Sequence, residues 1–340
     1  MNSNCLIILG MHRSGTSALS GVLSLLGVHP GEILMPAAED VNPKGFWEHV
    51  EIVSIHDKLL ESLGSSWEDG TPLPDRWWLS NHSIEFRNQI VNILRREFSN
   101  LSMWLIKDPR MCRLLPMWFE IFSELSCQPY FVITLRSPAE VAQSLHKRDG
   151  LADEVSCLLW LSYMLEAEFQ TRRKPRIFIN YTDLLVDWHE AIDSISKHLN
   201  LTWPITSEEA AKNIDEYLDS SLRHYVNNYS LPEHPVCCLA QQVFALLSTP
   251  TLNEMELDRL RLQTNELINL VAPWSKQFGQ SVLQLNKLNN QNLLYESENS
   301  ALQMELTRVK STFSWRVTSP LRVIWNRMCE VWKQHVKSKP

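Results

Sequence analysis

Four short runs of apolar residues constrain the fold of this chain more than any other feature. They are hydrophobic throughout rather than alternating with polar residues: CLIIL (5–9), MWLIKD (103–108), PYFVITLR (129–136) and RIFINY (176–181). Continuous hydrophobicity is typical of strands buried on both faces, as in a parallel sheet. We therefore expect four strands of a central, mostly parallel sheet.

Helical patterns fill the intervals between these runs. Apolar residues recur every three or four positions in SALSGVLSLLG (17–27), SIEFRNQIVNILRREF (83–98), PAEVAQSLHKR (138–148), EVSCLLWLSYMLEAEFQTRR (154–173) and LLVDWHEAIDSISKHLN (184–200). Strands that alternate with helices predict an α/β fold of three layers, with right-handed crossovers between the strands.

The composition narrows the classes of function. The chain has 340 residues, 44% of them hydrophobic, which is enough for one large core. Its net charge of −7 argues against nonspecific nucleic-acid binding, which needs a surplus of cations. The seven cysteines form no C-x-x-C pair, a pattern typical of a reducing compartment. With no secretory leader or membrane-spanning run in the sequence, we expect a cytoplasmic protein.

The C-terminal third has a different character, so we divide the chain into a domain at 1–255, a helical extension at 256–313 and a basic amphipathic tail at 314–340. From Val271 to Phe313 apolar residues follow a heptad spacing, with Asn292 and Asn299 at core positions. This pattern predicts a coiled coil from about residue 271, and hence a homodimer. The alternative is one amphipathic helix folded back on the domain. The tail could contact an anionic membrane surface or another protein.

The segment GMHRSGTS (10–17) connects the first strand to the first helix. A glycine-rich turn at a helix N-terminus presents backbone N–H groups to an anion, most often phosphate. An ATP-binding loop would carry a lysine directly after the second glycine, but that position is Thr16. Arg13 precedes Gly15 by two residues and can bind a terminal anionic group without a metal. The loop alone is also compatible with a purely structural turn.

These residues resemble the sulfotransferases that use 3′-phosphoadenosine 5′-phosphosulfate (PAPS). The first loop of that family has the form basic–Ser–Gly–Thr–Thr/Ser. The resemblance implies a P-loop NTPase-like domain and a PAPS-binding loop made by His12, Arg13, Ser14, Gly15, Thr16 and Ser17.

A second motif supports this resemblance. In LRSPAEVAQSL, Arg136 ends the third strand, Pro138 follows, and Ser144 lies eight residues after the arginine. The spacing is similar to the family element that holds the 3′-phosphate of the donor. An arginine at a strand end and a serine two turns into the next helix can converge on one phosphate.

A third segment, INYTDLL (179–185), is similar to a Tyr-x-Asp-Leu element of the family, and we interpret it as structural, with Asp183 as an N-cap. The likeness covers about residues 4 to 205. The family's nucleotide-covering segment is not evident after it, and Arg223 and His224 are weak substitutes.

Two cations are the candidates for stabilising charge during transfer, Arg13 and Lys107. Lys107 ends the second strand in WLIKDPR, a segment that resembles one in tyrosylprotein sulfotransferases. Parallel strands end at one edge of the sheet, where sites form in α/β folds. The alternative for Lys107 is an ion pair with Asp108.

Several groups are candidates for the base. Many cytosolic sulfotransferases have a histidine just after the lysine of the second strand, and this chain has none there. Carbohydrate and tyrosine sulfotransferases resemble one another in using a glutamate from the segment after the first helix. Glu48, in EDVNPKGFWEHVEI (39–52), is the first choice, because partial burial against Phe46 and Trp47 would raise its pKa. Its alternative role is an acid in the first turn of a helix. The other groups left open are Glu32, Glu39, Asp108, His49 and His56, and we expect the two histidines on a solvated helix face.

The resemblance therefore implies a sulfotransferase that uses PAPS as co-substrate, needs no metal and acts on an acceptor hydroxyl, with a small molecule or a saccharide as acceptor. The tryptophans of WEDGTPLPDRWW (67–78) could form a platform for such an acceptor or simply pack in the core. A P-loop kinase or nucleotide hydrolase is the alternative enzyme. A catalytically inactive sulfotransferase-like assembly module is the alternative of another class.

Overall fold

The computed structural model describes residues 3–38, 42, 44–218, 229–311, 326 and 328. Packing divides the chain into two units, Met1–Val271 and Ala272–Pro340. The first unit contains the sheet and is described first.

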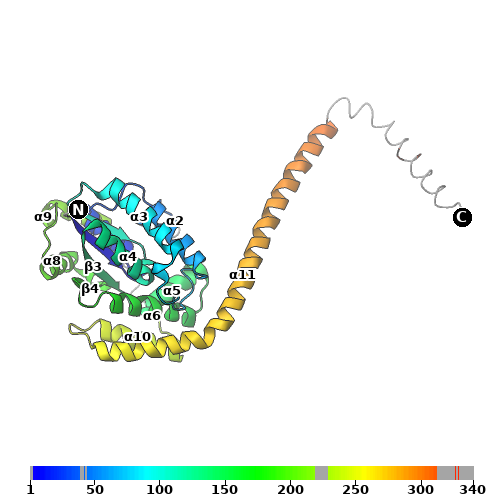
Figure 1. The fold of residues 1–340 in the computed structure, drawn as a ribbon. Coiled ribbons are helices and arrows are strands. Elements are labelled where there is room, and N and C mark those ends of the chain that lie inside the picture. Colours follow the sequence, from blue (N-terminus) through cyan, green and yellow to red (C-terminus); the bar gives the residue numbers. More distant parts are fainter. Residues whose placement is uncertain are drawn as a thin grey trace. The chain divides into compact units, whose positions relative to one another are not determined.

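Four parallel strands form the sheet in the order β2-β1-β3-β4 (Figure 1). Their bounds are Asn4–Leu9 for β1, Met103–Lys107 for β2, Gln128–Leu135 for β3 and Arg176–Asn180 for β4. In the register of the sheet, Ile7 of β1 pairs with Ile106 on one side and Phe131 on the other. The predicted α/β class and the four predicted strands are confirmed.

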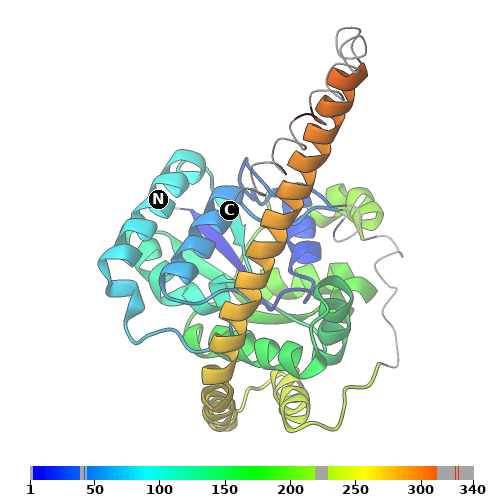
Figure 2. The ribbon, with the colours of Figure 1, turned by 90° about the vertical axis from the view of Figure 1, so that its right-hand side faces the viewer.

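Alternate residues of β1 point to opposite faces of the sheet, and different helices cover each face. Cys5, Ile7 and Leu9 belong to one buried cluster and Leu6 and Ile8 to another. Both clusters are almost wholly excluded from water, which explains why the strand sequences are continuously apolar. Figure 2 shows helices on both sides of the strands.

The cluster around Ile7 includes residues of α2 (Val50–Ser62), α3 (Asn81–Phe98), α4 (Met111–Leu125), α5 (Pro138–Asp149), α6 (Asp153–Gln170), α10 (Pro235–Leu247) and the start of α11 (Glu254–Ser311). The cluster around Leu6 includes residues of α1 (Thr16–Leu25), α7 (Tyr181–Val186), α8 (Trp188–Leu199) and α9 (Ser207–Tyr217). A short 3-10 turn, η1 (Trp77–Leu79), precedes α3.

The segment after β4 differs from its prediction. We expected one helix over 184–200, but the chain forms α7 and α8, which meet at Asp187. The backbone of Asp187 has φ −146°, and its carboxylate accepts a hydrogen bond from the amide of Glu190, so it caps α8. Asp183 is not the N-cap of α7. That position is Asn180, and Asp183 lies in the first turn.

Helix α11 begins in the first unit and continues into the second. Its first turns are anchored by the buried residues Leu257, Leu260 and Ile268. In the second unit the described side chains from Asn299 to Ser311 are all exposed. The side chains at heptad positions from Val271 to Asn292, and the basic tail apart from residues 326 and 328, lie outside the described part.

No helix in the described ranges combines the length and the apolarity needed to cross a bilayer.

Candidate functional site

The site forms where β1, β2 and β3 end, because neighbouring parallel strands place their carboxyl ends at one edge of the sheet. The loop of residues 10–15, which the sequence predicts to be a phosphate-binding loop, follows β1 and leads directly into α1. Lys107 is the last residue of β2, and Arg136 follows β3. The topology therefore gathers residues that lie far apart in the sequence.

Two glycines of the loop are required by its geometry. Gly10 has φ 146°, and a Cβ there would lie 2.3 Å from Oγ1 of Thr134. Gly15, the N-cap of α1, has φ 89°, and a Cβ there would lie 2.1 Å from the ring of Tyr181. Both positions exclude a side chain by space and by backbone conformation. The loop can thus bring its amides close to an anion at the N-terminus of α1.

The two predicted phosphate-binding motifs lie in direct contact. Arg136 donates from Nη1 to the carbonyl oxygen of Arg13 at 2.8 Å. Arg13 donates from Nε to Oγ of Ser144, also at 2.8 Å. Arg136 is held in addition by Glu140, at 2.7 Å from Nε, and by the ring of Tyr181, 4.6 Å from the guanidinium carbon. The second motif therefore converges on the loop, as its spacing predicted.

Two buried polar groups of the loop have no hydrogen-bond partner among the described residues. Ser14 is fully buried, and its Oγ has no hydrogen-bond partner among the described residues. The same holds for Nε2 of His12, another fully buried atom. Leaving such groups unpaired is costly, so native structures rarely do so without a ligand or water. Thr16 is also buried, whereas Ser17 donates its hydroxyl proton to the carbonyl of Phe46 at 3.2 Å.

His12 is held as a neutral imidazole. Burial, together with the nearby cations Arg110 and Arg148, lowers the pKa of His12 well below its usual value. Its ring lies 4.6 Å from that of Trp67 and 5.9 Å from that of Tyr163. A neutral imidazole in this place can accept or donate one hydrogen bond without bringing a further positive charge to the loop.

Glu48 and Lys107 form a buried ion pair, with Nζ of Lys107 2.5 Å from Oε1 of Glu48. The Lys107 side chain is 2% exposed and that of Glu48 9%. Burial raises the pKa of Glu48, although Lys107 opposes that shift. The direction of this pKa shift agrees with the sequence prediction, and burial is its largest cause. Glu48 is nearly fully buried and meets a cation, and Lys107 is not paired with Asp108.

Glu48 does not belong to the first turn of a helix, which was its alternative role. It precedes His49, the N-cap of α2. Its carbonyl oxygen accepts from the amide of Met35, and the amide of Val50 donates to Ile33. The base candidate is therefore held between two backbone hydrogen bonds to an earlier segment of the chain.

Asp108 is not a suitable base. Its Oδ2 lies 2.8 Å from Nδ1 of His56, and its Oδ1 accepts from the side chain and the amide of Arg110, each at 3.0 Å. Burial raises its pKa, but Arg110 and His56 outweigh that effect and hold the pKa of Asp108 below its usual range. A carboxylate with so low a proton affinity cannot accept the proton of an acceptor hydroxyl near neutral pH.

The two histidines expected on a solvated helix face are buried instead. Trp118 donates to Nε2 of His56 at 3.0 Å, so the imidazole must carry its proton on Nδ1, where it donates to Asp108. His49 accepts at Nδ1 from the amide of Ile52 and lies 3.0 Å from Glu97 through Nε2. Both rings thus have both nitrogens occupied, and neither can serve as a base without breaking these bonds.

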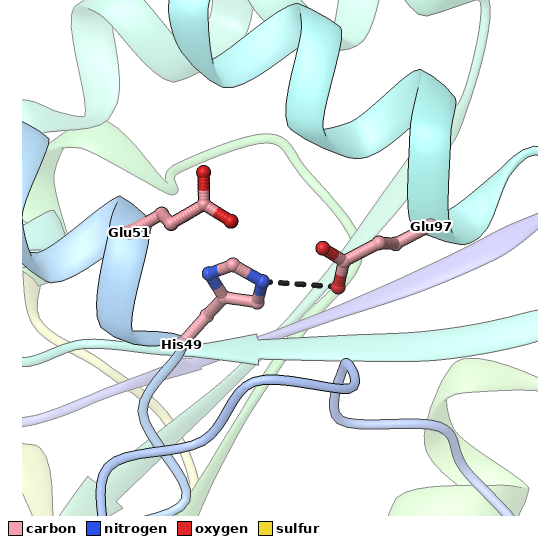
Figure 3. Close-up of side chains that lie close together, drawn as sticks. All are labelled: His49, Glu51 and Glu97. Atoms are coloured by element: carbon pink, nitrogen blue, oxygen red, sulfur yellow. Dashed lines mark hydrogen bonds and ion pairs between the residues drawn. The ribbon is translucent and has the colours of Figure 1, made fainter.

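His49, Glu51 and Glu97 are the one group of three possible metal ligands close together among the described residues (Figure 3). Arg96 bridges the two carboxylates with hydrogen bonds of 2.6 Å to each. With His49 donating to Glu97, these contacts tie α2 to α3. The group has a structural role that needs no ion. The expectation that the protein needs no metal stays a prediction.

Of the other carboxylates left open as base, Glu32 and Glu39, only Glu32 is among the described residues. Glu32 has an exposed side chain, and its amide donates to Glu97 at 3.2 Å. Glu39 lies outside the described residues, as do Arg223 and His224. Of the candidate bases that the structure describes, Glu48 alone contacts the cation at the end of β2.

The tryptophans of the segment 67–78 separate into two groups. Trp67 contacts His12 at the loop, and Tyr163 donates to its carbonyl at 2.8 Å. Trp77 and Trp78 line a cavity of about 230 Å³ together with residues of α4, α6 and α11. Arg113 holds the segment by donating to the carbonyls of Ser66 and Thr71. Only Trp67 therefore lies at the phosphate-binding loop.

Tyr181 and Tyr217 were not predicted as residues of the site. Tyr181 was interpreted as part of a structural motif, yet its ring packs on Gly15 and on Arg136. Tyr217, described below, lies far along the chain from any motif. For Tyr181 the nearby motif was a usable signal, whereas nothing in the sequence around Tyr217 indicates the contact.

No protein-family profile matches the chain, and no curated protein sequence matches it. Among solved structures, the sulfotransferase domain of the Synechococcus PCC 7002 olefin synthase is similar over 77% of this chain and 94% of its own, with 13% identity and a TM-score of 0.41. The sulfotransferase domain from the curacin biosynthetic pathway shares 14% identity over 72% of this chain and 98% of its own, with a TM-score of 0.40. Sulfotransferase STF9 from Mycobacterium avium has the same identity and TM-score over 72% of this chain and 76% of its own. These three solved structures are described as sulfotransferases or sulfotransferase domains.

Proposed function

We propose that the protein transfers a sulfuryl group from PAPS to the hydroxyl of an acceptor. The observation that carries the proposal is the convergence of two strand-to-helix junctions, in which Arg136 reaches the loop at Arg13 and Arg13 reaches Ser144. A nucleotide with phosphate groups at two ends fits such a pair of junctions. The unpaired buried hydroxyl of Ser14 and the unpaired nitrogen of His12 support a ligand at the same place.

In this proposal the loop amides and Ser14 hold the 5′ end of the donor, while Arg136 and Ser144 hold its 3′-phosphate. PAPS supplies an activated sulfuryl group. The new bond joins the acceptor oxygen to sulfur as the bond from sulfur to the bridging phosphate oxygen breaks. The electron pair of that bond stays on the departing phosphate, where Arg13 and Lys107 stabilise the negative charge.

Glu48 takes the proton of the acceptor hydroxyl. Burial raises its proton affinity and Lys107 limits that rise, so the carboxylate is a better base than an exposed glutamate while it can still be ionised. Accepting the proton weakens the Glu48–Lys107 attraction, which releases the Lys107 ammonium to the developing phosphate charge. One ion pair thus provides both the base and the cation.

The acceptor is proposed to be a small hydroxyl compound or a saccharide. A kinase function has less support, because the loop has no lysine after its second glycine. Moreover, Asp108, the acid that follows β2, is already bonded to Arg110 and His56. An inactive module has no need of a buried ion pair at the strand end, where it costs desolvation.

Calorimetric titration of the full chain with adenosine 3′,5′-bisphosphate tests the proposal. We expect micromolar binding, and Arg136→Ala should weaken it about 100-fold, because charge-assisted hydrogen bonds are lost at roughly 1.5 to 3 kcal/mol each. Arg136→Lys should recover only part of the affinity, since lysine lacks the planar fork.

Arg95→Ala is the matched control, since Arg95 is an exposed arginine of α3 that pairs with Glu124 of α4. It should leave the affinity unchanged. Tighter binding of magnesium-ATP than of the bisphosphate, or unchanged binding by Arg136→Ala, would contradict the proposal and favour a kinase.

A further inference from the structure

The segment that carries Glu48 is fastened to α1 in part by Tyr217, the last residue of α9. The hydroxyl of Tyr217 donates to the carbonyl of Ser17 at 3.1 Å and accepts from Nε1 of Trp47 at 2.9 Å. Ser17 lies in the first turn of α1, and Trp47 directly precedes Glu48. A single hydroxyl therefore bridges the phosphate-binding loop and the base-carrying segment.

Three further contacts tie the same parts together. Ser17 donates its hydroxyl proton to the carbonyl of Phe46, the second residue before Glu48. Nζ of Lys44 donates to the carbonyl of Tyr217 and lies 5.4 Å from its ring centre. The rings of Trp47 and Tyr217 meet edge to face, 6.1 Å apart. The segment 44–47 thus contacts the backbone and the ring of Tyr217 as well as Ser17 of α1.

The position of Tyr217 is fixed by a glycine of α1. A Cβ at Gly21 would lie 2.2 Å from both Cζ and the hydroxyl oxygen of Tyr217, so the ring rests directly on the helix backbone. Burial raises the pKa of Tyr217 to about 12, which keeps the hydroxyl protonated and able to donate to Ser17. The close contact between α1 and the ring at the last residue of α9 therefore requires a glycine at position 21.

The backbone at Trp47 explains why such a fastening is needed. Trp47 has φ 59°, in the left-handed region that residues with a side chain seldom occupy. Such a conformation persists only where surrounding contacts hold it. The hydrogen bond from Trp47 to Tyr217 supplies one, and the conformation of Trp47 sets the direction in which the chain continues into Glu48.

From these contacts we propose that Tyr217 is a positioning residue that couples ligand binding at the phosphate-binding loop to the placement of Glu48 against Lys107. An anion that fixes the first turn of α1 fixes the carbonyl of Ser17, and through Tyr217 it fixes Trp47. The inference rests on the proposed function for the identity of the ligand, but the fastening itself does not depend on it.

Amide hydrogen exchange on the full chain tests the coupling, with adenosine 3′,5′-bisphosphate as the probe. In the unmodified protein, saturation with the bisphosphate should slow exchange in the segment 44–49. Tyr217→Phe keeps the ring on Gly21 but removes both hydroxyl hydrogen bonds. It should bind the bisphosphate within about twofold of the original affinity while exchange in 44–49 becomes about tenfold faster, the change expected for two hydrogen bonds of ordinary net strength.

Trp47→Phe provides a second route to the same test, because it removes the donor and keeps a ring. The double variant Tyr217→Phe/Trp47→Phe should exchange no faster than Tyr217→Phe alone, since both changes remove the same hydrogen bond. Tyr130→Phe, at the start of β3, is the matched control and should change neither exchange in 44–49 nor affinity.

The outcomes separate the two proposals. If the bisphosphate fails to bind the unmodified protein, the proposed function fails, and faster exchange of 44–49 in unliganded Tyr217→Phe still supports the fastening. If exchange in Tyr217→Phe equals that of the unmodified protein, the positioning role is overturned. Full protection of 44–49 by the bisphosphate in Tyr217→Phe would overturn the coupling in the same way.

Discussion

Glu48 and Lys107 form a buried pair of opposite charges whose members depend on one another. Two charges lie out of water at the end of β2, each compensated mainly by the other. Removing one partner of a buried pair leaves an uncompensated charge, which costs more than the pair itself contributes. The stability of the domain should therefore depend on the two residues jointly.

We expect Glu48→Ala to lower the free energy of unfolding by about 3 kcal/mol, because the Lys107 charge is left buried and unpaired. The double variant Glu48→Ala/Lys107→Met should recover most of this loss, since no buried charge remains. Urea denaturation measures both. A double variant less stable than Glu48→Ala would contradict the expected coupling.

His12 makes a second prediction at the scale of single residues. Its pKa is lowered well below the usual value in the folded state, whereas in the unfolded chain it titrates near its ordinary value. As the pH falls from about 7 to about 5, the unfolded state binds a proton that the folded state does not. The stabilisation is thus present above the unfolded pKa and is lost on acidification.

His12→Gln removes this titration. The free energy of unfolding should therefore decline less between neutral and mildly acid pH in the variant than in the unmodified protein. Equal decline in the two proteins would show that His12 does not remain neutral in the fold. Denaturant melts at a series of pH values provide the comparison.

Among the elements, α11 extends from the first unit into the second, and its described end exposes large apolar side chains. Leu302 is 62% exposed and Leu306 49%. Both fall on the predicted heptad seam, and in a parallel two-stranded coil Glu305 would lie opposite Lys310 of a second copy. The apolar exposure and the charge pattern are those that a parallel two-stranded coil would need, and the homodimer stays a prediction.

Cross-linking tests this arrangement. Leu302→Cys lies on the seam, and mild oxidation should join two copies only if the helices run parallel and in register. Ser300→Cys, two residues away on the outer face, is the control and should cross-link poorly. Glu305→Lys should weaken the dimer, and Glu305→Lys/Lys310→Glu should restore it. A monomeric mass in light scattering at micromolar concentration would refute the coiled coil.

For the whole molecule, every described residue of the candidate site lies within the unit Met1–Val271. The first turns of α11 belong to this unit, because Leu257, Leu260 and Ile268 are buried in it. A chain ending at Val271 should therefore bind adenosine 3′,5′-bisphosphate within about twofold of the full chain and be monomeric, since binding free energy depends on local contacts. Loss of binding on truncation would show that the second unit contributes to the site.

Much of the fold could be predicted from the sequence, because its signals are local. The four strands are continuously apolar over a few residues, and the loop glycines precede a helix directly. The division of the helix predicted over 184–200 into α7 and α8 was missed, because Asp187 fits the solvated face of one long helix as well as it fits an N-cap. The choice depended on tertiary packing.

By itself, the sequence predicted that Arg13, Arg136 and Ser144 lie together, because motif spacing and the rule that parallel strands end at one edge bring them to one place. Only the tertiary structure decided how charges and protons are shared there. Lys107 pairs with Glu48 rather than with Asp108, and His56 bonds to Asp108. A buried charge is costly without a partner, and the fold determines which partner lies nearest. The contact between Tyr217 and Trp47 was likewise decided only by the tertiary structure, because it joins positions 170 residues apart.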